Sequence, residues 1–225
     1  NRMLEHDFRD FKNACALFNA FGSPIVSDVG REAEIAERML SRLNNPNLLA
    51  ELVSNKNLNK RRADFIRMDG NSLDEFPKLT ENDLYIIACG SYQRRLCSSY
   101  YAEHSKSDGR FEVQVCRHTG PLGLSSVNIQ AEDPILIRGR IHSRFSNRTK
   151  HLMYILVDVS KTGVDSIIKY CCQCKTGLRT IGCCAHVMVV LWYLGLGRYE
   201  SEIARPANSL DEFYVDLASD NTDSE

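Results

Sequence analysis

The feature that most constrains this chain is a concentration of cysteine, because five of its nine cysteines lie within residues 171–184. The total is odd, and the sequence shows no leader of the secretory type. A disulfide framework is therefore unexpected, whereas a tight cysteine cluster of this kind favours a metal site. We expect a reducing, intracellular location, in the nucleus or the cytoplasm.

The cluster has the spacing of metal ligands: C-x-C, nine residues, then C-x-H. Cys172 and Cys174 lie two apart on a predicted strand, so their side chains point to the same face. Cys184 and His186 begin an apolar helix and supply the other pair. Three thiolates and one imidazole complete the tetrahedral shell that suits zinc. Since no coordination position is left for water, we expect one structural Zn²⁺ and not a catalytic ion.

Alternatives to this ligand set remain at this point. The cysteines could be buried free thiols or a disulfide, with His186 an ordinary helix residue. Cys171 or Cys183 could also replace its neighbour as a ligand. Cys171 faces the opposite side of the strand, however, and the C-x-H spacing favours Cys184 over Cys183.

The first part of the chain has apolar residues at helical spacing. The pattern predicts helices over residues 3–22, 31–43, 48–54 and about 80–103. The last of these opens with a capping box at residues 80–83. We interpret the basic stretch 56–67 as a solvated helix face. Tyrosines within the 80–103 helix could form a surface for nucleic acid, but their spacing is more typical of a core.

Beyond residue 109 the hydrophobic period changes to two, which indicates strands. Strands are predicted over residues 111–116, 134–141, 151–159 and 165–172. The last three, in hairpin connection, make an antiparallel meander. The predicted fold class is α+β: a helical N-terminal half, then the meander and a zinc-bound C-terminal helix. The apolar core of that helix, 187–194, is too short to span a bilayer, so no membrane partner is expected.

The two ligand pairs and the strands before them resemble the SWIM zinc finger over about residues 134–197. The family pattern is C-x-C, a variable spacer and C-x-H. It carries over onto Cys172, Cys174, Cys184 and His186. SWIM domains occur in transposase-derived, chromatin and signalling proteins, where they are regarded as interaction modules. The resemblance therefore implies zinc binding, with nucleic acid or protein as the partner.

A wider resemblance concerns residues 15–24, which are similar to the last helix of Harbinger-like DDE transposases. Arthropod members of that group also carry a C-terminal SWIM finger. Together with the periodicity, the resemblance predicts the end of a transposase domain at 1–26, a helical linker at 27–108, and the sheet and finger at 109–197. The acidic composition predicts a disordered tail at 198–225. The carboxylates that hold two Mg²⁺ ions in those enzymes would lie upstream. We therefore expect no catalysis by this chain and no small-molecule substrate.

Charge limits how the chain could bind DNA. Its net charge of −1 excludes a globally basic nucleic-acid wrapper, so any contact needs a local patch. No acidic residue lies between Asp133 and Asp158, and basic residues gather there. The candidate phosphate contacts are Arg138, Arg140, Arg144, Arg148 and Lys150. The alternatives are an ordinary solvated sheet face, and a module that binds a protein through the acidic tail or the tyrosine-rich helix.

Overall fold

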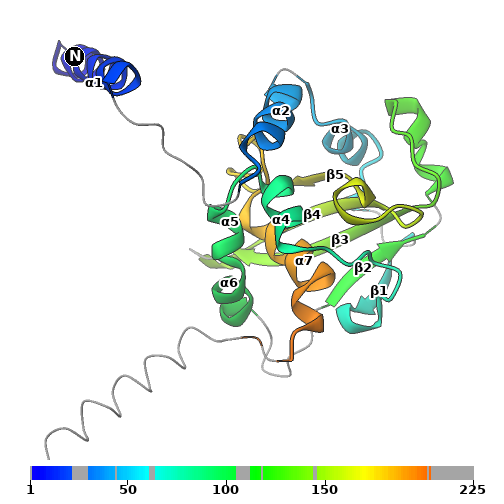
Figure 1. The fold of residues 1–225 in the computed structure, drawn as a ribbon. Coiled ribbons are helices and arrows are strands. Elements are labelled where there is room, and N and C mark those ends of the chain that lie inside the picture. The colour runs from blue at the N-terminus through cyan, green and yellow to red at the C-terminus, as the bar shows by residue number, and fades with distance from the viewer. Residues whose placement is uncertain are drawn as a thin grey trace, which may run out of the picture. The chain divides into compact units, whose positions relative to one another are not determined.

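A computed structural model of the chain shows an α+β fold (Figure 1). In the described part of the chain it has seven α-helices and one five-stranded antiparallel sheet. The structure describes residues 2–21, 30–43, 45–60, 64–104, 112–117, 119–143, 146–201 and 203. The chain divides into two compact units, Asn1–Glu32 and Ala33–Glu225, and each is described by itself. From residue 204 onward the predicted acidic tail lies outside the described residues.

The first unit contains one long helix, α1 (Arg2–Phe21), where the sequence predicts a helix over 3–22. Its phenylalanines follow one another at steps of three, seven and three residues, which places them on one face of the helix. Phe8, Phe11, Phe18 and Phe21 are between 51% and 85% exposed. Among the described residues of this unit, no other element buries the apolar face of α1.

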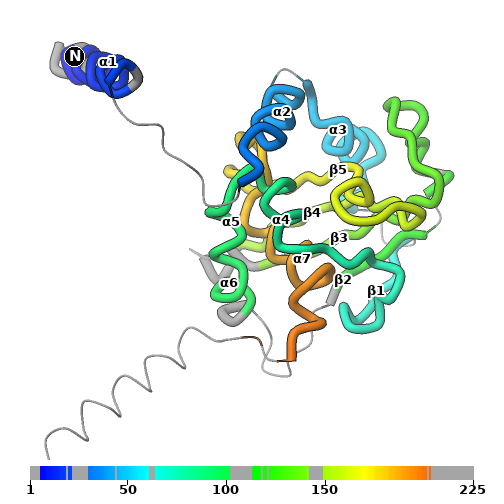
Figure 2. Tube along the Cα trace, viewed as in Figure 1, coloured from blue at the N-terminus to red at the C-terminus, as the bar shows by residue number. Residues whose placement is uncertain are grey.

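The second unit is built on a meander in which each strand pairs with the next along the chain (Figure 2). Its strands are β1 (Ile66–Asp69), β2 (Glu112–Cys116), β3 (Pro134–Ser143), β4 (Ser146–Asp158) and β5 (Ile167–Cys172). All neighbouring pairs are antiparallel. The four predicted strands and their meander are confirmed.

The sequence does not predict strand β1, and the helical interpretation of residues 56–67 is wrong for the part that the structure describes: residues 56–60 form a turn, and Ile66 and Arg67 belong to β1. Ile66 pairs with Val115 and Met68 with Val113. Leu58 and Phe65 are buried. Charged residues dominate the sequence pattern of this stretch, and few apolar residues lie between them. The charge pattern alone therefore predicts a solvated face. Residues on both sides of the expected boundary at 108 thus share one sheet, and the N-terminal half is not purely helical.

One face of the sheet is covered by α7 (Ala185–Gly195), with α4 (Glu81–Ala88), α5 (Tyr92–Arg95) and α6 (Cys97–His104) packed against that helix (Figure 1). The sequence predicts an apolar core at 187–194 in α7, and every residue of 187–195 is buried. The reason is that one side of α7 packs on the sheet and the other side packs on the shorter helices. None of the described helices combines the length and the apolar character needed to cross a bilayer.

The single helix predicted over 80–103 is divided in three. Its start is confirmed, since Thr80 and Asp83 form the expected capping box. The first segment ends because Cys89 and Gly90 have φ angles of 57° and 148°, which no α-helix can accommodate. Tyr100 is buried, as the core interpretation predicts, whereas Tyr92 is 70% exposed.

The opposite face of the sheet is covered by α3 (Leu48–Asn55) and by the connection that follows β2. This second core includes Leu49, Leu52, Leu136 and Leu156, all at most 1% exposed. Helix α2 (Glu32–Leu43) precedes α3, and both lie where the sequence predicts helices. The sheet is therefore covered on both faces over much of its area. This cover determines which basic side chains of β3 reach solvent.

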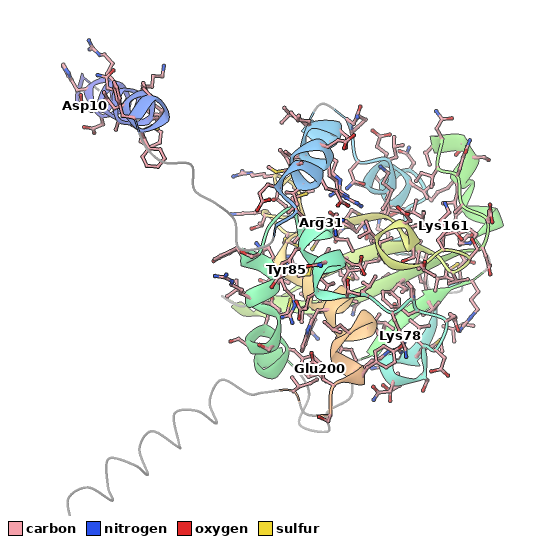
Figure 3. All side chains as sticks on the ribbon, viewed as in Figure 1. Asp10, Arg31, Lys78, Tyr85, Lys161 and Glu200 are labelled. Atoms are coloured by element: carbon pink, nitrogen blue, oxygen red, sulfur yellow. The ribbon has the colours of Figure 1, made fainter. Side chains whose placement is uncertain are left out.

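A buried carboxylate closes the turn after β4. Asp158 is 0% exposed and accepts hydrogen bonds from the backbone N–H groups of Glu132, Asp133 and Ser160 and from the Ser160 hydroxyl. Burial alone would raise the pKa of Asp158, but these hydrogen bonds outweigh it and hold the pKa well below the usual range. Lys161, at the edge of this turn (Figure 3), lies 3.7 Å from the carboxylate.

We predict that Asp158→Asn lowers the free energy of unfolding by about 1–3 kcal/mol at pH 7, because an amide cannot accept all of these hydrogen bonds. The folded pKa is depressed, so the stabilisation is present above the unfolded pKa of about 3.9 and is lost as the pH falls toward the folded value. Urea titrations of both proteins between pH 7 and pH 2.5 should therefore converge at low pH. The exposed Asp165→Asn is the control and should stay within about 0.5 kcal/mol of wild type at pH 7. A constant difference between wild type and Asp158→Asn across the range would contradict the assignment.

Candidate metal centre

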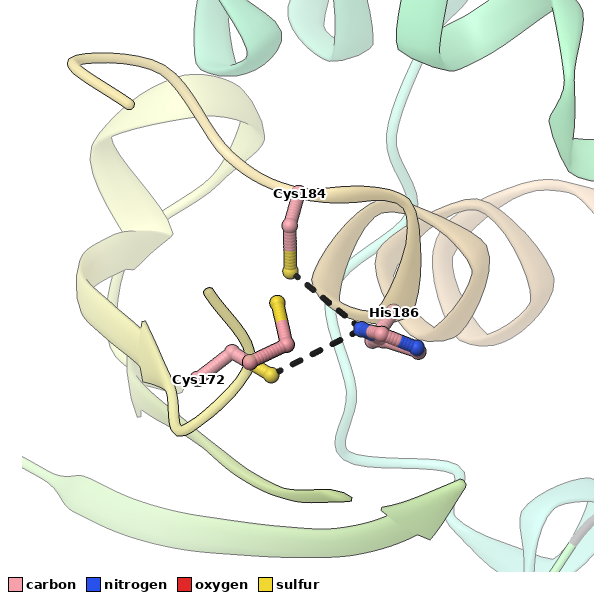
Figure 4. Close-up of side chains that lie close together, drawn as sticks. Cys172, Cys184 and His186 are labelled. Atoms are coloured by element: carbon pink, nitrogen blue, oxygen red, sulfur yellow. Dashed lines mark hydrogen bonds between the residues drawn. The ribbon is translucent and has the colours of Figure 1, made fainter. Parts of the chain in front are cut away.

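The end of β5 and the start of α7 bring the candidate ligands together (Figure 4). Cys172 is the last residue of β5, and the register pairs it with Met153 on β4. Cys184 is the extended N-cap residue of α7, with φ −82° and ψ 168°, and His186 is the second residue of that helix. The loop between them folds back, as the sequence requires for a shared site.

The four donor atoms of Cys172, Cys174, Cys184 and His186 all lie within 4.8 Å of one another. The Sγ atoms of Cys172 and Cys184 are each 3.8 Å from Nδ1 of His186. A tetrahedral zinc ion with bonds of about 2.3 Å to sulfur and 2.0–2.1 Å to nitrogen sets neighbouring donors roughly 3.6–3.8 Å apart. The residues present therefore fit one metal ion, and the geometry is compatible with zinc binding.

The three cysteine side chains of the cluster interact closely with one another. All three cysteines are buried. Cys172, and after it Cys184, donates to the sulfur of Cys174, which lowers the pKa of the Cys174 thiol. The same contacts raise the pKa of Cys172. A divalent cation held among the three sulfurs would stabilise negative charge on all of them.

Gly177 shapes the loop around Cys174. Its backbone N–H donates to the Cys174 sulfur at 3.0 Å. A Cβ at this position would lie 2.8 Å from Cβ of Cys172, 2.9 Å from its carbonyl oxygen and 3.2 Å from Cys174 Sγ. The close approach of loop and ligands therefore requires glycine.

The imidazole of His186 is positioned by two aromatic neighbours. The His151 ring on β4 lies 4.8 Å from it, centroid to centroid, and the Tyr100 ring on α6 meets it edge-on at 5.6 Å. Sequence reasoning missed these rings and Gly177. Only the glycine had a local signal, because it follows Cys174 by three residues, where a tight ligand loop must turn.

Cys171 and Cys183 do not join the donor cluster, so the choice of their neighbours as ligands is supported. Cys171 packs with the core on the other face of the sheet. Cys183 is buried, and burial raises its pKa. All nine cysteines are free thiols, which disfavours the disulfide alternative.

The candidate phosphate contacts are placed less uniformly. Arg138 is only 5% exposed, with its guanidinium 3.8 Å from the centroid of the Phe65 ring. It donates from Nε to Gln114 and from Nη1 to the Leu58 carbonyl, each at 2.7 Å. The segment before β1 covers this part of the sheet, so Arg138 does not present its guanidinium to solvent as a phosphate contact requires.

The structure describes the side chains of only two of the other four candidate phosphate contacts. Arg140 and Lys150 are exposed, and the β3–β4 register places both on the same face of the sheet as Arg138. Arg144 lies outside the described residues, and so does the side chain of Arg148. Two of the five candidates thus present a described cation to solvent.

Comparisons of the chain with protein-family models, with curated proteins and with solved structures each found no match. The features that bear on function are therefore the geometry of the donor cluster and the charges around it.

We predict that Gly177→Ala weakens zinc binding by about tenfold or more, because the added methyl group displaces Cys172 or Cys174. Competition with a chromophoric chelator measures the change. Gly120→Ala is the matched control, since a Cβ there meets no atom within 4 Å, and it should bind zinc as wild type does. Equal affinities of both variants would show that the loop does not constrain the ligands.

Proposed function

We propose that this chain is a SWIM-type zinc-binding module, in which one structural Zn²⁺ joins the end of the meander to the last helix. The observation that carries the proposal is the convergence of three sulfur atoms and one imidazole nitrogen within 4.8 Å. Cysteine sulfur and histidine nitrogen are the donors that zinc prefers in structural sites.

A structural role follows from the completeness of the donor set. Four protein donors fill a tetrahedral shell, which leaves no position for a substrate or a reactive water. The ion would hold Cys172 and Cys174 to the N-terminal end of α7, the most buried helix of the second unit. Zinc binding can supply on the order of 10 kcal/mol, which is comparable with the whole stability of a small domain.

The module serves DNA binding in this proposal. Exposed Arg140 and Lys150 share one sheet face in a stretch without acidic residues. Such cations position a protein on the phosphate backbone without reading the sequence. The zinc-stabilised packing would provide a rigid support for them. In this proposal the chain acts by binding and not by catalysis.

A second candidate is a protein-interaction module without nucleic-acid binding. The exposed aromatic face of α1 favours it, since a row of phenylalanines at helical spacing is suited to a hydrophobic groove of another protein. The salt dependence of DNA binding separates the two candidates.

For the zinc site, we predict one equivalent of zinc in the purified protein and none in Cys174→Ser. Because the ion would contribute much of the folding energy, the variant should also lose the cooperative unfolding of residues 134–197. Elemental analysis and circular dichroism measure the two effects. Cys171→Ser, which removes a neighbouring thiol outside the donor cluster, should keep its zinc. A full equivalent of zinc in Cys174→Ser would refute the ligand assignment.

For DNA, we predict binding to duplex DNA of arbitrary sequence that weakens steeply as the salt concentration rises. The slope of log K against log salt should be about −0.9 for each phosphate neutralised. Fluorescence anisotropy with a labelled 20-base-pair duplex measures it. Absence of binding at 20 mM salt by zinc-loaded protein would remove the DNA role and leave the protein-interaction candidate.

A further inference from the structure

A groove beside the metal centre has an unbalanced positive charge. It has a volume of about 540 Å³, and its walls come from α2 and the α2–α3 connection, from β5, and from the loop 177–184. These segments belong to the second unit and lie near one another around β5 (Figure 1). Four cationic residues line it, with no aspartate or glutamate among the lining residues: Arg38, Arg42, Lys169 and Arg179.

The cations of the groove repel one another. The pKa of Lys169 is lowered by burial and then by Arg42 and Arg38. The pKa of Arg38 is likewise lowered by burial and then by Arg42. Tyr170, Cys89 and Asp165 act on the pKa of Arg38 in the opposite sense, but each acts more weakly than Arg42. Like charges held at such proximity favour an anion between them.

The two arginines of α2 are held differently. Arg42 is fixed in place, since it donates to the hydroxyl of Tyr170 and to the Ile181 carbonyl at 3.3 Å. Arg38 has a buried Nε with no hydrogen-bond partner among the described residues. A buried, unpaired guanidinium N–H is costly, and an anionic oxygen acceptor would satisfy it.

The chemistry of the groove selects phosphate and not a nucleobase. Tyr170 supplies the one aromatic ring among the lining residues, and the Arg42 guanidinium lies 5.1 Å from its centroid. The Tyr170 hydroxyl donates to the Ile87 carbonyl at 2.8 Å. This ring is thus already occupied, whereas single-stranded nucleic acids are bound through stacking on aromatic rings. Lys169 and Arg179 are exposed, so a long polyanion can reach them from solvent.

We propose that this groove is the main phosphate-binding site of the chain, and that it receives the backbone of duplex DNA through Arg38, Arg42, Lys169 and Arg179. The inference deepens the proposed DNA-binding function and rests on it. In this proposal the principal contact with the DNA phosphates lies in the groove between α2 and the loop 177–184, and not on the β3–β4 face. Because Cys174 and Cys184 flank that loop, the zinc ion would hold one wall of the groove in place.

The first test compares two double variants that each remove two exposed cations. Lys169→Gln/Arg179→Gln alters the groove, and Arg140→Gln/Lys150→Gln alters the β3–β4 face by the same charge. DNA affinity is measured by anisotropy with a random 20-base-pair duplex at 50–300 mM salt. Zinc content and thermal unfolding confirm that both variants are folded.

We expect the groove variant to bind DNA at least about tenfold more weakly at 100 mM salt, with a salt slope smaller by about 2. The β3–β4 variant should lose less affinity. Unchanged affinity and slope in the groove variant, with DNA binding by wild type, would overturn this inference but leave the proposed function intact. Failure of wild type to bind DNA at low salt would overturn both, whatever the zinc content.

The second test separates a binding role of Arg38 from a structural one. Arg38→Gln removes a cation that its neighbours repel, so the midpoint of thermal unfolding should stay the same or rise. DNA affinity should fall severalfold at 100 mM salt. A lower unfolding midpoint with unchanged DNA affinity would show that Arg38 only supports the fold, and would overturn its place in the site.

Discussion

The convergence of four donor atoms where β5 meets α7 is the constraint on which the account depends. Strand and helix approach closely enough for Cys172 and Cys184 each to lie 3.8 Å from the imidazole of His186. Three thiols in such proximity cannot all ionise without a cation. The local chemistry therefore favours a bound metal, which would fix the angle at which α7 begins.

That angle matters because α7 is central to the second unit. It packs on the sheet with one side and on α4, α5 and α6 with the other, so residues 187–195 are all buried. The opposite sheet face is closed by α3 and the segment before β1. A two-sided sheet leaves little of its surface for ligands. Four cationic residues consequently lie at its edge, where β5 meets α2 and the loop 177–184.

The donor set and much of the fold could be predicted from the sequence, because they depend on residues that are close together in the chain. The C-x-C and C-x-H spacings gave the donor set, period-two patterns gave four strands, and the Thr80 capping box gave the start of α4. The features that the sequence did not predict depend on packing between segments that are far apart in the chain. Cations masked the apolar residues around β1, and the contact of Leu58 and Phe65 with Arg138 brings a formally basic strand residue into the core. The groove likewise combines residues from α2, β5 and the loop, which no local pattern connects.

X-ray absorption spectroscopy at the zinc edge of the purified protein tests the central claim most directly, because it reports which atoms surround the ion and at what distance. The account predicts one zinc per chain with about three sulfur neighbours near 2.3 Å and one nitrogen near 2.0–2.1 Å. A shell composed of oxygen and nitrogen, or of four sulfurs, would contradict the assignment of Cys172, Cys174, Cys184 and His186 as the ligands.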